Sequence, residues 1–272
     1  MTGEDPYLWL EDVEGERALT WVREQNERSL ATLEADPRFA QLQADAIALA
    51  NSRDRLPTGG IQDGYYYNFW QDETHVRGVY RRAPVAEFAR NASPNWETVL
   101  DIDAIAAAEN ANWVFKGADC LEGSTRCMIA LSDGGRDAST YREYDFATRA
   151  FVPNGFVVPE AKSGVAWLDE NTLLVATDWG EGSMTESGYA YIIKRWTRGT
   201  PLASATEIIR GQATDVGVFP GVLQDTDGRR LPIAVEADTF FESTTWRLDG
   251  PAPQRISLPP KATVQGLHRG HI

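Results

Sequence analysis

Two patterns of hydrophobic and polar positions divide the chain near residue 57. Residues 14–35 carry apolar side chains at helical spacing, which predicts an amphipathic helix. Asp36 and Pro37 suit an N-cap and a first helical position, and they predict a second helix that ends near residue 50. The two segments predict an αα-hairpin in which each helix has an apolar face that needs a partner. The apolar positions of the first helix are Leu19, Val22, Leu30 and Leu33.

After residue 57 the hydrophobic period changes from near 3.6 to near 2, which predicts β-strands. Turn signals such as Asp63-Gly64 and Asp133-Gly134-Gly135 separate the strand-like runs. One exception, residues 101–109, has the composition of a short helical insertion. The predicted strands are residues 65–70, 76–82, 96–100, 113–116, 127–131, 141–146, 172–176, 189–196, 233–236 and 244–248.

A repeated unit in this second part predicts the fold. Four segments share one design, in which a strand with basic and aromatic residues is followed by a polar turn and a strand that restarts on apolar residues. Their markers, 64, 52 and 50 residues apart, are Tyr80, Tyr144, Trp196 and Trp246. A period near 50 with several strands per unit is typical of a β-propeller with kelch-sized blades, and a β-sandwich is the alternative.

The end of the chain bears on whether this propeller closes. Residues 264–272 look like the start of another strand, and an unclosed ring leaves sheet faces and edges bare. We therefore expect a mainly β fold: an incomplete β-propeller of about four antiparallel blades, preceded by the helical hairpin. Bare faces of this kind promote association, so we expect oligomers or aggregates through unpaired blade edges.

Composition and charge exclude several classes of protein. The chain has 272 residues, 42 % of them hydrophobic, with 40 acidic and 26 basic side chains and a net charge of −14. Because no basic run exceeds a pair, nucleic-acid binding is not expected. No stretch approaches the ~20 apolar residues that span a bilayer, so no membrane partner is expected. The acidic N-terminal residues differ from a basic signal peptide, and we expect a cytoplasmic protein.

The cysteines and histidines give little sign of a metal or cofactor site. Cys120 and Cys127 are the only cysteines, and without a secretion signal we expect them to be reduced and partly buried. A disulfide across a short hairpin and an incomplete metal site are the alternatives, although the spacing fits no compact zinc motif. His75 is expected to be a surface or hydrogen-bonded residue. Asp225–Gly228 begins like a calcium loop but lacks its later ligands, so we expect a hairpin turn, no metal and no cofactor.

Several motifs along the whole chain resemble one family. The chain opens with the sequence Asp5-Pro-Tyr-Leu-Trp-Leu-Glu-Asp12, followed by the predicted helices and the blade repeat. Further stretches are Asn112–Gly117, Leu131–Asp137, Leu173–Gly180, Gly182–Tyr189 and Lys194–Leu202. Together they resemble the N-terminal part of the prolyl oligopeptidase family of serine peptidases.

This resemblance implies a two-domain architecture. In the family, an N-terminal helical segment and a C-terminal α/β-hydrolase form the catalytic domain, and a seven-bladed propeller covers the active site. Residues 1–59 then correspond to the helical lead, and residues 60–272 to about the first four blades. The implied activity of the whole enzyme is peptide-bond hydrolysis by a Ser-His-Asp triad, often after proline, with peptides as substrates.

The catalytic motif of that family is missing from this chain. The Gly-x-Ser-x-Gly elbow that carries the nucleophile is absent, and the triad positions correspond to residues beyond Ile272. We therefore expect no catalytic residue here and no activity of the chain alone. The predicted function is that of the N-terminal, substrate-gating propeller region of such a peptidase. A standalone non-catalytic binding module and one half of a split peptidase are the alternatives.

The loop between two predicted strands at residues 178–189 is the most suggestive local segment. It holds three glycines, an aromatic residue near each end and two glutamates, and loops of that length are often functional. The prediction is that Trp179, Glu181, Glu186 and Tyr189 line the path of the peptide substrate. The alternative is a connection between two blades whose glycines serve only its turns.

Overall fold

The computed structural model describes residues 5–91, 93–259 and 261–272. The chain divides into two compact units, Met1–Leu56 and Pro57–Ile272. The first strand of the second unit begins at Gly59, a residue that the sequence-based division assigns to the helical lead. The acidic start of the chain falls partly on residues outside the described ones. No helix among the described residues is both long and apolar enough to cross a membrane.

The first unit consists of η1 (Leu8–Glu11), α1 (Glu16–Glu34) and α2 (Phe39–Ala50), so both predicted helices are confirmed. The predicted N-cap of α2 is wrong. Asp36 lies in the preceding turn, where its carboxylate accepts hydrogen bonds from the amide nitrogen (2.9 Å) and the guanidinium (2.8 Å) of Arg38. Because the carboxylate closes this turn, it does not cap the helix that follows.

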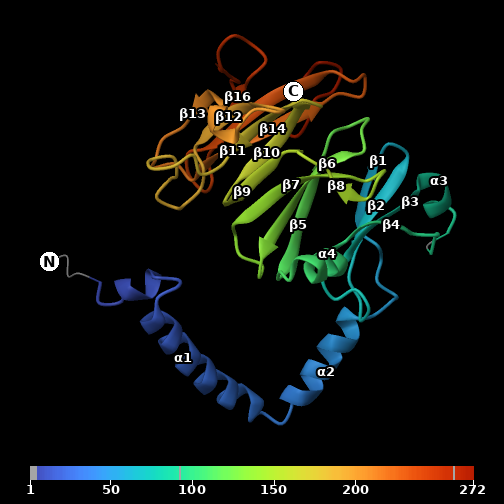
Figure 1. Ribbon diagram of the computed structural model, residues 1–272, viewed down its shortest axis with the longest axis vertical. Helices are drawn as coiled ribbons and strands as arrows, with labels where there is room; N and C mark the ends of the chain where they lie inside the picture. The colour runs from blue at the N-terminus through green and yellow to red at the C-terminus, as the bar shows by residue number, and fades with distance from the viewer. Residues whose placement is uncertain (1–4, 92, 260) are drawn as a thin grey trace. The chain divides into compact units, whose positions relative to one another are not determined.

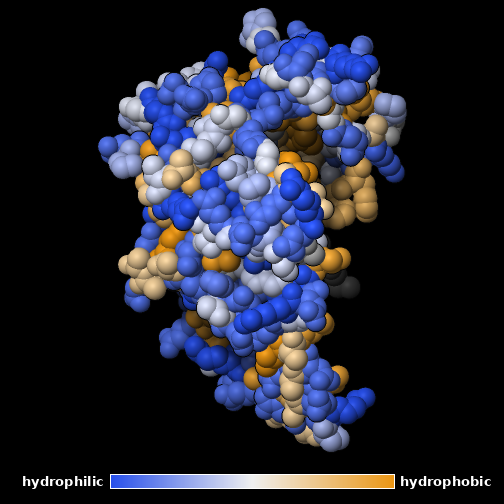
Figure 2. Space-filling model, turned by 90° about the vertical axis from the view of Figure 1, so that its right-hand side faces the viewer, coloured by the Kyte–Doolittle hydropathy of each residue, from blue (hydrophilic) through white to orange (hydrophobic). Residues whose placement is uncertain are grey.

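The helices of this unit leave their apolar residues uncovered. Figure 1 shows α1 and α2 diverging from the turn that joins them, and only Ala18 of the two helices is buried. Apolar surface is visible on the helical unit at the bottom of Figure 2. The exposed large apolar residues of α1 and α2 are Leu19, Trp21, Val22, Leu30, Leu33, Leu42, Ile47 and Leu49. The expectation that each helix has a face in need of a partner is consistent with this exposure.

The second unit is built from four antiparallel sheets that follow one another along the chain (Figure 1). The first sheet consists of β1 (Gly59–Gln62), β2 (Tyr65–Trp70), β3 (Val79–Pro84) and β4 (Glu97–Asp101). The second consists of β5 (Trp113–Cys120), β6 (Arg126–Asp133), β7 (Ser139–Asp145) and β8 (Ala150–Phe151), with β9 (Val157–Ala161) also paired to β7. The third consists of β10 (Gly164–Asp169), β11 (Thr172–Ala176), β12 (Ile192–Thr197) and β13 (Thr206–Arg210). The fourth consists of β14 (Gly217–Gln224), β15 (Arg230–Ala237), β16 (Thr244–Arg247) and β17 (Gln254–Arg255).

Three short helices connect these strands. They are α3 (Val85–Phe88), α4 (Ile102–Glu109) and η2 (Leu202–Ser204). The predicted insertion at residues 101–109 is confirmed as α4, with Asp101 as its N-cap, because the Asp101 carboxylate accepts a hydrogen bond from the amide of Ala104 at 2.9 Å.

The core lies between the sheets. Alternate residues of a strand point to opposite faces, so a strand between two sheets must be apolar on both. In β6, Ile129 and Leu131 pack toward the first sheet, whereas Met128 packs toward the third. In β11, Leu173 contacts the second sheet and Leu174 the fourth. This explains why both strands are continuous apolar runs in the sequence.

Three buried clusters hold the blades together in series. One joins the first and second sheets, one the second and third, and one the third and fourth. No buried cluster of the described residues joins the fourth sheet to the first. The mainly β, four-blade propeller of antiparallel sheets is therefore confirmed, and the β-sandwich alternative is wrong.

The repeat markers identify equivalent strands of the four blades. Tyr80, Tyr144, Trp196 and Trp246 lie on β3, β7, β12 and β16, the third strand of each sheet. All ten predicted strands are present with small shifts at their ends. The strands that were not predicted include the first strands β1, β10 and β14. Each begins with glycine, and β14 also carries Pro220. In β1, a Cβ on Gly59 would lie 1.8 Å from the carbonyl oxygen of Tyr67, so close packing excludes the residue types that signal a strand.

Candidate functional site

The predicted site loop connects the second and third strands of one blade, β11 and β12. The alternative of a connection between blades is therefore wrong. Hydrogen bonds within the loop fix its shape: the Ser183 hydroxyl accepts from the amide of Trp179 at 2.8 Å and donates to the carbonyl of Gly180 at 2.6 Å. Ser183 and Thr185 are buried although both are polar. The loop is thus a folded element.

Two contacts join this loop to the connection between β13 and β14. The Thr185 hydroxyl donates to the carbonyl of Val216 at 3.2 Å, and the amide of Glu186 donates to the carbonyl of Ala213 at 3.1 Å. The loop of the third blade is therefore held against the segment that leads into the fourth. A substitution here affects two blades at once.

The four candidate residues have two different roles in the loop. The Trp179 indole donates to the carbonyl of Ile192 at 3.0 Å, and the ammonium of Lys194 lies 4.4 Å from the centre of its ring system. The Tyr189 ring packs in the same way under the ammonium of Lys162, at 4.4 Å. These half-buried rings anchor the two ends of the loop, with cation–π contacts that contribute about 0.5–1 kcal/mol each at partly exposed sites.

The two glutamates are presented to solvent between these anchors. Glu181 and Glu186 are both exposed. Exposed carboxylates on a loop with fixed ends can attract a cationic group with little ordering cost. Whether they face a peptide stays a prediction.

The loop lies at one defined end of the sheets. In an antiparallel sheet whose strands are joined in order, the start of the first strand and the connection between the second and third lie at the same end. We call the end where β1 begins the proximal end. The loops at this end are residues 71–78, 134–138, 177–191 and 238–243, together with the connections between blades. The candidate loop therefore lies at the same end of the sheets as the start of β1.

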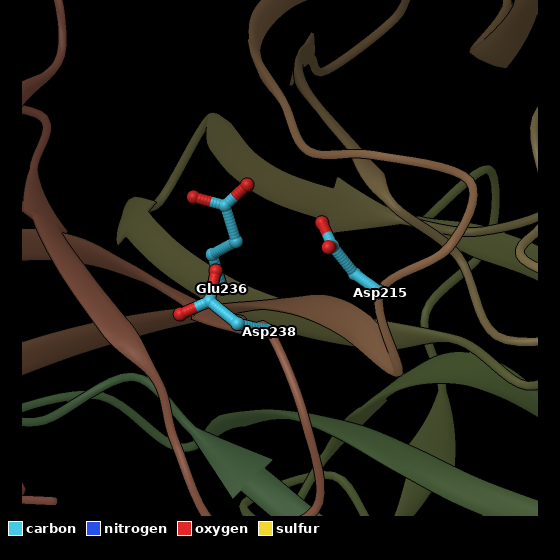
Figure 3. Close-up of side chains that lie close together, drawn as sticks. All are labelled: Asp215, Glu236 and Asp238. Atoms are coloured by element: carbon cyan, nitrogen blue, oxygen red, sulfur yellow. The ribbon is translucent and has the colours of Figure 1, made fainter.

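Three carboxylates meet at the proximal end of the fourth blade (Figure 3). One ligand oxygen from each of Asp215, Glu236 and Asp238 lies within 4.8 Å of the others. Burial raises the pKa of Glu236, and the nearby charges of Asp215 and Asp238 raise it further, whereas a hydrogen bond from Trp246 acts in the opposite direction. Sequence reasoning missed this group because Asp215 is distant in the chain.

These carboxylates also stabilise the local structure. Asp215 accepts from the amide of Gln212 at 2.6 Å, and Glu236 accepts from the indole of Trp246 at 2.8 Å. The geometry suits a cation, but the same oxygens already have structural partners. Like charges held this close also account for the raised pKa of Glu236.

The turn predicted at Asp225–Gly228 is confirmed as the β14–β15 hairpin. The amide of Gly228 donates to the carbonyl of Asp225 at 3.0 Å. Burial of the Asp225 carboxylate opposes its charge, but hydrogen bonds from the amides of Gly270, Arg269 and Thr226 outweigh this and lower its pKa to about 2. The carboxylate thus ties the last residues of the chain to the fourth blade.

His75 is hydrogen-bonded, as predicted, with its Nδ1 atom 3.1 Å from the Asp72 carboxylate. Burial of Asp72 opposes its charge, but the amides of His75 and Thr74 outweigh this and lower its pKa to about 2. The pair orders the loop at residues 71–78, and no described nucleophilic side chain is hydrogen-bonded to it.

The expectation of two reduced cysteines is wrong, because Cys120 and Cys127 form a disulfide. The register of β5 and β6 places the two residues directly opposite each other, with their Cα atoms 3.9 Å apart. The sequence argument considered only the redox compartment. The alternative of a disulfide across a short hairpin is therefore confirmed by the pairing of the two strands.

A buried carboxylate lies next to this disulfide. Burial raises the pKa of Asp119 to about 6, although the positive charge of Arg230 acts against it. Asp119 lines a cavity of about 200 Å³ that is bordered by β5, β10 and β14, the first strands of three blades. An ionised carboxylate in this position weakens the packing of the blades.

This raised pKa predicts a pH-dependent stability. Because the folded chain binds the Asp119 proton more tightly than the unfolded chain, stability falls as the pH rises from about 4 to above 6. Asp119→Asn removes the charge, so the variant is expected to be about 1–3 kcal/mol more stable than the wild type near pH 7.5. Urea unfolding at several pH values measures this. The advantage should shrink at pH 5, and the exposed Asp137→Asn should show neither effect.

Comparison with known proteins identifies the family. The family described as "Prolyl oligopeptidase, N-terminal beta-propeller domain" matches residues 2–271. The chain belongs to the prolyl oligopeptidase family. It is the N-terminal propeller domain of such peptidases, and no catalytic domain is present in it, which agrees with the absence of a Gly-x-Ser-x-Gly sequence.

Relatives of the prolyl oligopeptidase family show how much of a whole enzyme this chain represents. An uncharacterized peptidase of Sinorhizobium fredii is 45% identical over 98% of this chain, and an uncharacterized peptidase of Rickettsia prowazekii is 26% identical over 97%. The chain spans 38% of the length of each. The structure of a post-proline cleaving enzyme from Rickettsia typhi matches 95% of this chain and 39% of its own with a TM-score of 0.84 and 26% identity. Oligopeptidase B from Leishmania major, at 12% identity and a TM-score of 0.67 over 93% of this chain and 35% of its own, shares the fold.

Proposed function

We propose that this propeller restricts the access of peptides to the catalytic domain of a prolyl-oligopeptidase-like enzyme and hydrolyses no peptide bond by itself. The observation that carries the proposal is the match of nearly the whole chain to the propeller domain of that family. Two further observations support it. The sequence lacks the nucleophile elbow, and the loop at residues 178–189 lies at the end of the sheets where β1 begins.

The experiment is an activity assay on the purified chain. With a chromogenic peptide that contains proline, release of the chromophore should equal that of buffer alone. A fluorophosphonate probe for activated serines should leave the chain unlabelled. Turnover that survives repeated purification, with labelling of one serine, contradicts the proposal.

Within this function, we propose that the loop at residues 178–189 contributes to the surface that faces the peptide. The anchoring of Trp179 and Tyr189 supports this, because it fixes the exposed Glu181 and Glu186 at the proximal end. Two fixed negative charges would favour cationic substrates.

Neutralising both glutamates tests the role of this loop. In a full-length enzyme with this propeller, Glu181→Gln together with Glu186→Gln is expected to lower kcat/KM for a lysine-containing peptide about threefold to tenfold relative to a neutral one. The control is Glu170→Gln, because Glu170 is exposed in the β10–β11 turn at the opposite end. An unchanged ratio between the two peptides discards the proposed role.

We also propose that the chain associates with itself through the uncovered faces of its first and last sheets. The three buried clusters join only successive sheets, and α1 and α2 add further exposed apolar residues. Contiguous exposed apolar surface favours association. Sedimentation velocity should show a mass that increases with concentration, and a concentration-independent monomer contradicts this.

A cytoplasmic location stays a prediction. The Cys120–Cys127 disulfide bears on it, because stable disulfides are uncommon in reducing compartments. Fractionation of the source cells, followed by alkylation of free thiols, measures both the location and the redox state of the pair.

A further inference from the structure

The two sulfur atoms of the disulfide have different surroundings. Cys127 is 1 % exposed and belongs to the buried cluster between the first two sheets. Cys120, directly opposite on β5, packs against the same cluster but is partly exposed, and it also belongs to the lining of the cavity beside Asp119. A reductant from solvent can therefore reach the Cys120 side of the bond more easily than the Cys127 side.

The disulfide adjoins the place where three blades are held together. The Trp167 indole on β10 donates to the carbonyl of Asp119 on β5 at 2.9 Å. From the fourth blade, the Arg230 guanidinium donates to the carbonyls of Trp167 (2.8 Å) and Leu168 (2.6 Å). A shift of the backbone at Asp119 and Cys120 would therefore alter the hydrogen bond to Trp167 in the third blade. Through Trp167 it would also alter the contacts of Arg230 in the fourth blade.

An unsatisfied group in this network shows that it is imperfectly packed. The Nε atom of Arg230 is buried and has no hydrogen-bond partner. The Asp119 carboxylate interacts with Arg230 electrostatically. Leaving a buried donor unpaired costs free energy, so this network contributes less to stability than a fully hydrogen-bonded one would.

We propose that the Cys120–Cys127 disulfide is a reversible redox switch that sets how tightly the second, third and fourth blades are joined. Oxidation holds β5 against β6 at Cys120 and stabilises the contacts of Asp119 with Trp167. Reduction releases this end of the hairpin and weakens those contacts. The inference concerns the propeller itself and does not depend on the proposed peptidase function.

The chemistry is thiol–disulfide exchange with a low-molecular-weight thiol such as glutathione. A thiolate attacks the Cys120 sulfur, forms a mixed disulfide there and expels the Cys127 thiolate, which takes up a proton. A second thiolate attacks the outer sulfur of the mixed disulfide, which releases Cys120 as a thiol after protonation. In sum, two thiols are oxidised to one disulfide and the protein disulfide is reduced to two thiols.

The test uses the whole chain in glutathione buffers of graded redox poise. Acid quenching, alkylation and mass spectrometry give the reduced fraction, and hydrogen exchange is measured on the same samples. We expect reversible reduction within the physiological range of poise and a glutathione adduct on Cys120. Amide exchange in β5, β6 and β10 should become on the order of tens-fold faster after reduction, while α1 and α2 of the first unit stay unchanged.

Two variants serve as controls. Cys120→Ala together with Cys127→Ala should show the fast exchange pattern in every buffer, and Cys127→Ala alone should form the adduct on Cys120. Three results each overturn the proposal: a pair that stays oxidised at the most reducing poise, adducts found mainly on Cys127, or reduction that leaves exchange in β10 unchanged. Because the wild-type chain supplies all three readouts, the test stands even where a variant folds poorly.

Discussion

Replacing Glu143 by alanine is expected to destabilise the propeller by about 3–5 kcal/mol. The Glu143 side chain on β7 is completely buried and accepts hydrogen bonds from the Arg198 guanidinium at 2.8 and 2.9 Å and from the amide of Phe156 at 2.8 Å. Arg126 adds a third contact at 3.2 Å. Because Arg198 follows β12, the carboxylate joins the second blade to the third, and its loss removes the only carboxylate that is hydrogen-bonded to Arg198 among the described residues.

The same carboxylate predicts a loss of stability in acid. Burial opposes the charge of Glu143, but Arg198, the amide of Phe156 and Arg126 outweigh it and hold its pKa below the ordinary value. A carboxyl group whose pKa is lower in the folded chain than in the unfolded chain stabilises the fold at a pH above its unfolded-state pKa. This contribution is lost as the pH falls through its folded-state pKa. The decrease in the free energy of unfolding between neutral and acidic pH should therefore be smaller for Glu143→Ala than for the wild type.

Equilibrium unfolding in urea, followed by tryptophan fluorescence, measures the effect of Glu143→Ala. The matched control is Glu170→Gln, whose side chain is exposed, with an expected change within about 0.5 kcal/mol. The double variant Glu143→Ala with Arg198→Ala should lose less than the sum of the two single variants, because the charges are coupled. Strict additivity would show that the pair contributes nothing as a pair.

Replacing Trp167 by alanine is expected to cost a similar amount, about 3–5 kcal/mol. The side chain on β10 is 2 % exposed and packs edge-to-face on Phe156 with ring centroids 5.7 Å apart. It also donates a hydrogen bond across the blade interface to the carbonyl of Asp119 at 2.9 Å. Truncation therefore opens a cavity between two blades and leaves a carbonyl without its donor.

The variant Trp167→Phe separates these two effects. It retains an aromatic ring but removes the donor, so we expect a loss of only about 1–3 kcal/mol. Trp21→Ala in the helical unit is the control, because that indole is 41 % exposed, and it should leave unfolding of the propeller unchanged. Equal losses for the phenylalanine and alanine variants would mean that packing in this interface contributes little.

Local patterns of the sequence identified most of the individual elements. The helices around Leu19 and Ile47, ten strands and the third strand of every blade follow from spacing alone, because alternation and helical periodicity depend on neighbours in the chain. First strands such as β14 were not predicted, because close contacts with other blades require glycine and Pro220 at positions where a typical strand has larger apolar residues. Those contacts connect residues far apart in sequence.

The candidate site was predictable only in part. Glycine content and length indicated the loop at residues 178–189, and Trp179 and Tyr189 do mark its ends. No sequence pattern indicated that Thr185 and Glu186 are hydrogen-bonded to the connection to the next blade, or that Asp215 lies close to Glu236 and Asp238. Hydrogen bonds and charge clusters of this kind require two segments to be brought together by the fold.

Composition and local patterns were enough to identify an acidic, mainly β chain with a helical lead and without the Gly-x-Ser-x-Gly elbow, and they predicted a propeller. The pairing of Cys120 with Cys127, the link that Glu143 makes between two blades and the raised pKa of Asp119 follow from the three-dimensional arrangement alone. The reason is physical: residue type and spacing specify local conformation, whereas pairing and pKa depend on which distant groups share a buried volume.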